Sequence, residues 1–308
     1  MNIEITKNKP IYLDNQATTP IDPRVLEAML PYFERKFGNP HSSGHYYGWE
    51  ASEAVELARE QIADFICADP DEIFFTSGAT ESNNTAVKGV ARFYKARRNH
   101  IITCVTEHMC ILDSAFQLEK EGFEVTYLNV KSDGLIDLIE LEKLITKQTI
   151  LVSIMTAQNE IGTIQPIAEI GEICRENKIF FHTDAAQAIG KIPVNVKDMK
   201  VDLLSLTAHK IYGPMGVGAL YVGKNPRTQL EPLFNGGGQE GGLRSGTLSP
   251  PLCVGLGQAL VIAKSEMADE SARLTLYRDK VWKQISRKIT GLHLNGTADN
   301  RLPGNLNF

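Results

Sequence analysis

Short apolar segments alternate with helical segments along most of the sequence, and this alternation limits the folds open to the chain. Strands separated by helices are joined by right-handed crossovers, which give a mostly parallel sheet covered by helices on both faces. The pattern therefore predicts an α/β fold built on such a sheet. The expected strands are 73–75, 100–105, 123–130, 149–155, 179–184 and part of 201–210, and the expected helices are 50–66, 109–122, 137–144, 167–177 and one after the polar turn 76–84.

Polar side chains follow the carboxyl ends of several expected strands. In sheets of this kind, ligands gather outside the carboxyl ends of the strands, so we expect these side chains to share a site. The residues in question are His108, Asn159, Asp184 and Lys210.

Lys210 ends an apolar run that begins at Val201 and opens a glycine-rich turn, 211–218. A lysine delivered there by a buried strand is poorly solvated, so its pKa should fall toward the range in which the neutral amine forms a Schiff base. Asp184 ends the preceding apolar strand and suits the ring nitrogen of pyridoxal phosphate (PLP). Alone, either residue is more simply a core-edge lysine or a strand-end acid. The pair favours PLP.

A phosphate site should accompany that ring. Residues 77–81 supply backbone N–H groups and a hydroxyl at the start of an expected helix, which suits a dianion. The same small polar residues could be a simple N-cap. The phosphate interpretation is favoured because Lys210 and Asp184 independently indicate PLP.

A second glycine-rich segment, 236–241, matches the dinucleotide-binding pattern G-x-G-x-x-G. That pattern binds dinucleotides when it follows a strand and opens a helix, whereas residues 242–251 are expected to break a helix. We therefore reject the dinucleotide interpretation. We expect a mobile loop that brings Arg244 and Thr247 to an anion.

Composition is that of an ordinary enzyme of one large domain with a partial second one, or of two domains. The net charge of −5 argues against direct nucleic-acid binding. Neither a signal segment nor a membrane-spanning run is found, so no membrane partner and a cytoplasmic location are expected. The five cysteines are scattered, which disfavours disulfides, and the group Cys104, His108 and Cys110 lacks a fourth metal ligand.

Seven motifs occur in order along the chain: YLDNQATTP (12–20), TSGATESNN (76–84), TEH (106–108), QNEIG (158–162), DAAQ (184–187), AHKIYGP (208–214) and RSGT (244–247). Together they resemble the cysteine desulfurases, and most closely the housekeeping type that feeds iron–sulfur cluster assembly. The resemblance implies the PLP-dependent transferase fold (fold type I, class V aminotransferase-like). It also implies conversion of L-cysteine to L-alanine, with sulfur delivered as a persulfide to an iron–sulfur scaffold, to tRNA thiolation and to other acceptor proteins.

The resemblance further implies roles for individual residues. Lys210 would hold PLP as a Schiff base, His108 would stack on the ring and move protons, and Asp184 would pair the ring nitrogen. Thr247 would reach the phosphate of the other protomer, which implies a homodimer. The remaining cofactor-binding residues would be Ala79 and Thr80 at the phosphate, Asn159 beside the ring, Gln187 at the ring hydroxyl, and Thr207, Ala208 and His209 next to the lysine.

The sequence departs from the family toward its C-terminus. The family's sulfur-accepting cysteine and the arginine that clamps the substrate carboxylate are both expected beyond Phe308. We therefore expect a C-terminally truncated chain, with an N-terminal segment 1–20, a large PLP-binding domain 21–261 and an incomplete small domain 262–308 that ends in the start of a strand. Two alternatives remain open, namely a catalytically incompetent PLP-binding remnant and a lyase acting on selenocysteine or cysteine sulfinate.

Overall fold

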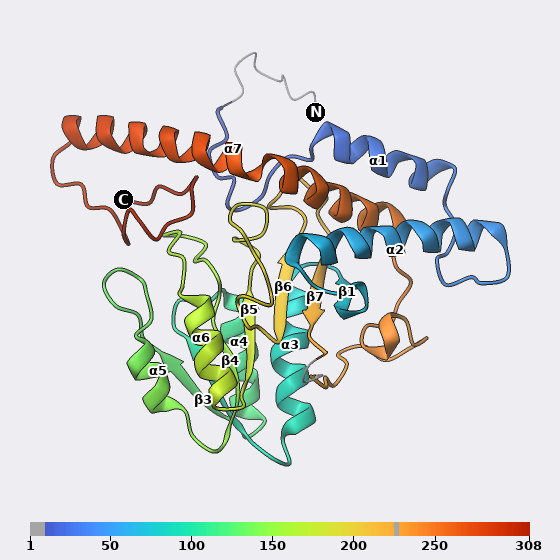
Figure 1. Ribbon diagram of the computed structural model, residues 1–308, viewed down its shortest axis with the longest axis horizontal. Coiled ribbons are helices and arrows are strands. Elements are labelled where there is room, and N and C mark those ends of the chain that lie inside the picture. The colour runs from blue at the N-terminus through green and yellow to red at the C-terminus, as the bar shows by residue number, and fades with distance from the viewer. Residues whose placement is uncertain (1–9, 225–227) are drawn as a thin grey trace, which may run out of the picture.

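The fold is that of a computed structural model, which describes residues 10–224 and 228–308. Seven strands form one sheet in the order β1-β7-β6-β5-β4-β2-β3 (Figure 1). β7 runs antiparallel to both of its neighbours, and the other four pairings are parallel. The predicted α/β fold with a mostly parallel sheet is confirmed. The strands are β1 (Ile73–Thr76), β2 (His100–Cys104), β3 (Glu124–Leu128), β4 (Thr149–Ser153), β5 (Phe180–Asp184), β6 (Leu203–Thr207) and β7 (Gly218–Val222).

Helices cover both faces of the sheet. The helices are α1 (Pro23–Glu34), α2 (Tyr46–Ile66), α3 (Ala79–Tyr94), α4 (Met109–Lys120), α5 (Leu138–Leu144), α6 (Ile167–Glu176) and α7 (Pro250–Lys288), with short 3-10 turns at Pro70–Glu72 and Glu240–Gly242. Each helix predicted from the sequence is present. α2 begins four residues earlier than expected because the His45 side chain caps it by accepting the N–H of Gly48.

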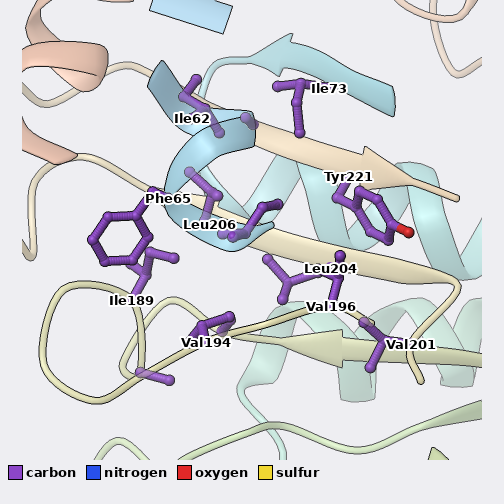
Figure 2. Close-up of a cluster of buried hydrophobic side chains, with 14 of the residues drawn as sticks. Ile62, Phe65, Ile73, Ile189, Val194, Val196, Val201, Leu204, Leu206 and Tyr221 are labelled. Atoms are coloured by element: carbon purple, nitrogen blue, oxygen red, sulfur yellow. The ribbon is translucent and has the colours of Figure 1, made fainter. Parts of the chain in front are cut away.

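Two apolar clusters hold these layers together. Adjacent residues of β6 point to opposite faces, so Leu204 joins the cluster under α2, α6 and α7, while Leu203 joins the cluster under α3 and α4. Figure 2 shows the first cluster, where Ile62 and Phe65 of α2 lie over Leu206. Burial on both faces explains why the central strands are continuous apolar runs rather than alternating ones.

The expectation that residues 242–251 break a helix is wrong for the last two of these residues. Pro250 and Pro251 open the 39-residue helix α7. Proline is well suited to the first turn of a helix, where no intrahelical partner is needed for its missing N–H. The first half of α7 packs on α1 and α2, and the second half extends past the sheet (Figure 1). The domain boundary proposed at 261/262 falls within this helix and stays a prediction.

The remaining described segments are irregular. Residues 305–308, expected to begin a strand, form none; Asn305 instead donates to the backbone oxygen of Glu160 at 2.8 Å. A strand requires a partner, and within the described chain no strand of the sheet pairs with this segment. None of the helices described is long and apolar enough to span a bilayer.

Candidate active site

A cavity of about 2250 Å³ opens at the carboxyl edge of the sheet, beneath the second half of α7. It brings together most of the residues selected from the sequence. Two of the selected residues do not line it: Ala208 is fully buried, and Thr247 is exposed on another part of the surface. Those that line it are Ala79, Thr80, His108, Asn159, Asp184, Gln187, Thr207, His209 and Lys210.

Lys210 lies in the connection between the antiparallel strands β6 and β7, residues 208–217. The Ala208 N–H donates to the Val217 oxygen at 3.2 Å and closes the base of this connection. Thr19, from the N-terminal segment, fixes its outer side, since the Thr19 N–H and hydroxyl both donate to the His209 oxygen, at 2.8 and 2.9 Å. The lysine is therefore presented by a loop held at both ends.

A second amine, Lys191, lines the same cavity and was not selected from the sequence. Burial, and then the charge on Lys210, lower the pKa of Lys191 to about 8. Its Nζ donates to the Gln187 Oε1 at 2.8 Å, and the Gln187 Nε2 donates in turn to the Gln16 oxygen at 2.9 Å. The four-residue spacing from Gln187 to Lys191 was the signal for this contact.

Asp184 is buried at the end of β5, where two donors fix its carboxylate. Oδ1 accepts the Ala186 N–H at 2.8 Å, and Oδ2 accepts from the Asn83 side chain at 2.6 Å. Glu107, also buried, accepts the Met155 N–H at 2.6 Å. Burial, together with the nearby charge of Asp184, raises the pKa of Glu107 well above its usual range. Of these two buried acids, Asp184 lines the cavity and Glu107 does not.

His108 caps the N-terminus of α4, and its Nδ1 accepts the Cys110 N–H at 3.2 Å. The Cys110 Sγ lies 3.0 Å from the same nitrogen and 3.2 Å from the Asn83 Nδ2. Burial raises the pKa of Cys110 to about 11, so this sulfur is a thiol. The sequence showed Cys110 only as a metal-ligand candidate beside Cys104 and His108. The described residues contain no group of three or more potential ligands able to hold a metal ion.

The phosphate cradle expected at 77–81 has a suitable shape. Gly78 caps α3 with φ at +146°, and the N–H groups that follow it lie in the first turn, where a helix provides no partners for them. Gly218 of β7 approaches so closely that a Cβ there would lie 2.7 Å from the Gly78 Cα. A side chain at either position would therefore disturb this edge of the cavity.

The expectation that a loop brings Arg244 to a bound anion stays a prediction. In this structure the Arg244 Nε donates to the Glu81 Oε1 at 2.8 Å, so the guanidinium is paired with a carboxylate of α3. The sequence could not show this pairing because 163 residues separate the two partners.

The other four cysteines lie outside the cavity. Cys67 is exposed at the end of α2, with φ at +60°. Burial raises the pKa of the remaining three thiols, which are Cys104, Cys174 and Cys253. None of the three is therefore a ready thiolate nucleophile.

Comparisons with known proteins extend over nearly the whole chain. The aminotransferase class-V family model matches residues 11–308. The cysteine desulfurase IscS of Rickettsia massiliae (strain Mtu5) is 56% identical over 309 residues, which cover 100% of this chain and 75% of that relative. A solved structure of a NifS-like protein has a TM-score of 0.92 at 43% identity and covers 96% of this chain and 80% of its own. Another, described as "SspA in complex with cysteine", has a TM-score of 0.85 at 43% identity, with coverages of 96% and 82%.

Proposed function

Because the chain belongs to the aminotransferase class-V family and, within it, to the cysteine desulfurases, we propose that it takes sulfur from L-cysteine with PLP as cofactor. L-alanine would be the other product, and the sulfur would leave as a persulfide for iron–sulfur cluster assembly and tRNA thiolation. The observation that carries the proposal is that Lys210, Asp184 and His108 line the same cavity.

The donor set of the cavity fits PLP. An amine, a buried carboxylate and a helix N-terminus match, in that order, the aldehyde, the pyridine nitrogen and the phosphate of the cofactor. When bound, PLP accepts the electrons released at the substrate α-carbon. The residues that would hold it are Ala79, Thr80, Asn159, Asp184, Gln187, Thr207, Ala208, His209 and Lys210.

Each reactive side chain then has a defined task. The Lys210 amine takes the α-proton of the substrate, since it is the amine of the β6–β7 connection and faces the cavity. The Asp184 carboxylate keeps a proton on the ring nitrogen, because Asp184 is the buried acid at the end of β5 that lines the cavity. The His108 imidazole, fixed at the start of α4, moves a proton to or from the substrate sulfur.

Asp184→Asn tests the electrostatic part of this proposal. An amide cannot hold the ring nitrogen protonated, so we expect the fold and some PLP binding to survive while α-proton exchange of a bound amino acid slows. Loss of one charge-assisted contact of about 1.5–3 kcal/mol corresponds to roughly 10- to 150-fold in rate. Exchange would be followed by NMR in deuterated water.

Asp202→Asn is the matched control for that variant. Asp202 is another largely buried acid that accepts a strand N–H, that of Phe181 at 2.8 Å, but it lies outside the cavity. The control should exchange at the native rate. An unchanged rate in Asp184→Asn would show that Asp184 is not the partner of the ring nitrogen.

The sulfur-transfer step is tested with the 308-residue chain itself. Burial raises the pKa of four of its thiols, and the fifth cysteine, Cys67, lies outside the cavity. We therefore expect the chain to bind PLP but to form a protein persulfide only very slowly. The chain, PLP and either L-cysteine or L-selenocysteine would be incubated with and without a reductant, and alanine and persulfidated peptides measured. Alanine from L-cysteine when an external thiol is added supports a desulfurase.

Two other outcomes separate the alternatives. No alanine from either substrate identifies a catalytically incompetent PLP-binding protein, and preferential turnover of L-selenocysteine identifies a lyase of that class. Efficient persulfide formation on one of the five cysteines would contradict the expectation drawn from their burial.

We also propose that the protein works as a homodimer in the cytoplasm and passes sulfur to an iron–sulfur scaffold and other acceptor proteins. Free thiols at all five cysteines suit a reducing compartment. Exposed aromatic side chains at the start of α2 and before it suit a protein interface, and exposed Thr247 is free to reach a partner's phosphate site. A monomeric mass by light scattering of the PLP-bound protein would contradict the dimer. The aromatic residues are Phe33, Phe37, Tyr46, Tyr47 and Trp49.

A further inference from the structure

We propose that Asn83 and Cys110 are positioning residues, which form a hydrogen-bonded bridge from Asp184 to His108 and hold the His108 proton on Nε2. The inference rests on the proposed function only in taking Asp184 and His108 as the side chains that act at the cofactor. Asn83 lies on α3 and Cys110 on α4, so the bridge joins two helices to the end of β5.

Asn83 forms the first half of the bridge. Its side chain is fully buried, and its Nδ2 lies 2.6 Å from the Asp184 Oδ2 and 3.2 Å from the Cys110 Sγ. A primary amide has two N–H donors, one for each of these acceptors. Rotating the amide by half a turn would place its oxygen against the Asp184 carboxylate, which is repulsive. The orientation of Asn83 is therefore set by Asp184.

Cys110 forms the second half. Its sulfur accepts from Asn83 and lies 3.0 Å from the His108 Nδ1, so an S–H directed at that nitrogen completes the bridge. The backbone N–H of Cys110 approaches the same nitrogen at 3.2 Å. Because burial raises the pKa of this thiol to about 11, it keeps its proton near neutral pH. In the bridge, the Asn83 amide thus donates to Asp184 and Cys110, and Cys110 donates to His108.

The tautomer of His108 follows from this arrangement. Two donors converge on Nδ1, so Nδ1 must be the unprotonated nitrogen and the neutral ring must carry its proton on Nε2. A ring free to exchange tautomers would offer the cavity a donor at one moment and an acceptor at the next. The bridge favours the tautomer with the proton on Nε2. It also makes the tautomer of His108 depend on the charge of Asp184.

Histidine NMR of the cofactor-free protein tests both statements. In the chain labelled with ¹⁵N-histidine, His108→Gln identifies the His108 signals, and we expect the Nε2–H pattern. We then expect Asp184→Asn to shift the Nδ1 signal of His108, because the amide removes the charged acceptor of Asn83. In a Cys110→Ala background this response should fall by more than about half, as coupled residues do in a double-mutant cycle.

Two further variants make the comparison specific. Cys110→Ser keeps a donor at this position and should preserve the response, and Cys67→Ala removes an exposed thiol outside the cavity and should leave it complete. An Nδ1–H pattern in the native chain, or an equal response with and without the Cys110 thiol, would overturn the bridge. Since no cofactor or substrate is present, the result is independent of whether the chain proves to be a desulfurase.

Discussion

Replacing Lys210 with alanine is expected to abolish covalent attachment of PLP and to lower the rate of sulfur release by at least about 10³-fold, since it removes both the amine that binds the aldehyde and the base. In the native chain, borohydride reduction in the presence of PLP followed by peptide mapping should place the label on Lys210. The variant should keep its fold, because the connection that carries the lysine is held by backbone hydrogen bonds of Ala208 and His209.

Lys191 provides the matched control for this experiment. It is a second amine that lines the cavity, and burial and the charge of Lys210 lower its pKa to about 8. In the Lys191→Ala chain the label should still be found on Lys210. A label on Lys191 in the native chain, or a chain that takes up no label at all, would refute the assignment of Lys210.

Arg59→Ala should destabilise the protein strongly. Arg59 donates to the Glu240 Oε1 at 2.8 Å and to the Ile73 oxygen at 2.6 Å, and both charged side chains are buried. Removing the arginine leaves a carboxylate without its counter-ion, so we expect the free energy of unfolding to fall by about 3–5 kcal/mol. Glu240 also accepts the Phe75 N–H at 2.6 Å, so β1 should loosen first. Urea unfolding followed by circular dichroism measures the loss.

Arg92→Ala is the control for burial. Arg92 donates to Glu121 at 2.7 Å, but both side chains are a quarter or more exposed, and such pairs contribute about 1 kcal/mol or less. Equal losses in the two variants would mean that the Arg59 pair contributes no more than a surface ion pair.

The parts of the fold predicted correctly are those that local sequence determines. β5 and β6 are apolar runs that end in functional side chains, and each element expected from such a run is found within a few residues of its predicted bounds. The same local signals placed Asp184 and Lys210 at one edge of the sheet. The site followed because parallel strands bring their carboxyl ends together.

What could not be predicted depends on contacts between distant residues. The pairing of Arg244 with Glu81 and the bond from Asn83 to Asp184 join residues 163 and 101 positions apart. The raised pKa of Glu107 follows from burial, which no local pattern reveals. The start of α7 was predicted wrongly for another reason. Proline breaks a helix in its interior but is also common in the first turn, and the local sequence does not distinguish the two cases.

The position of β7 has a consequence for the order in which the chain can fold. β1 is an edge strand whose one partner in the sheet is β7, so Ile73 pairs with Tyr221, 148 residues later in synthesis. β6 and β7, by contrast, pair across a short connection and can form early once both have been made. Until residues 218–222 have been synthesised, β1 has no strand to pair with. The phosphate cradle that follows β1 also lacks its contact with Gly218. β1 can therefore join the sheet only after the segment that carries Lys210 has been made, and until then the growing chain exposes an unpaired strand.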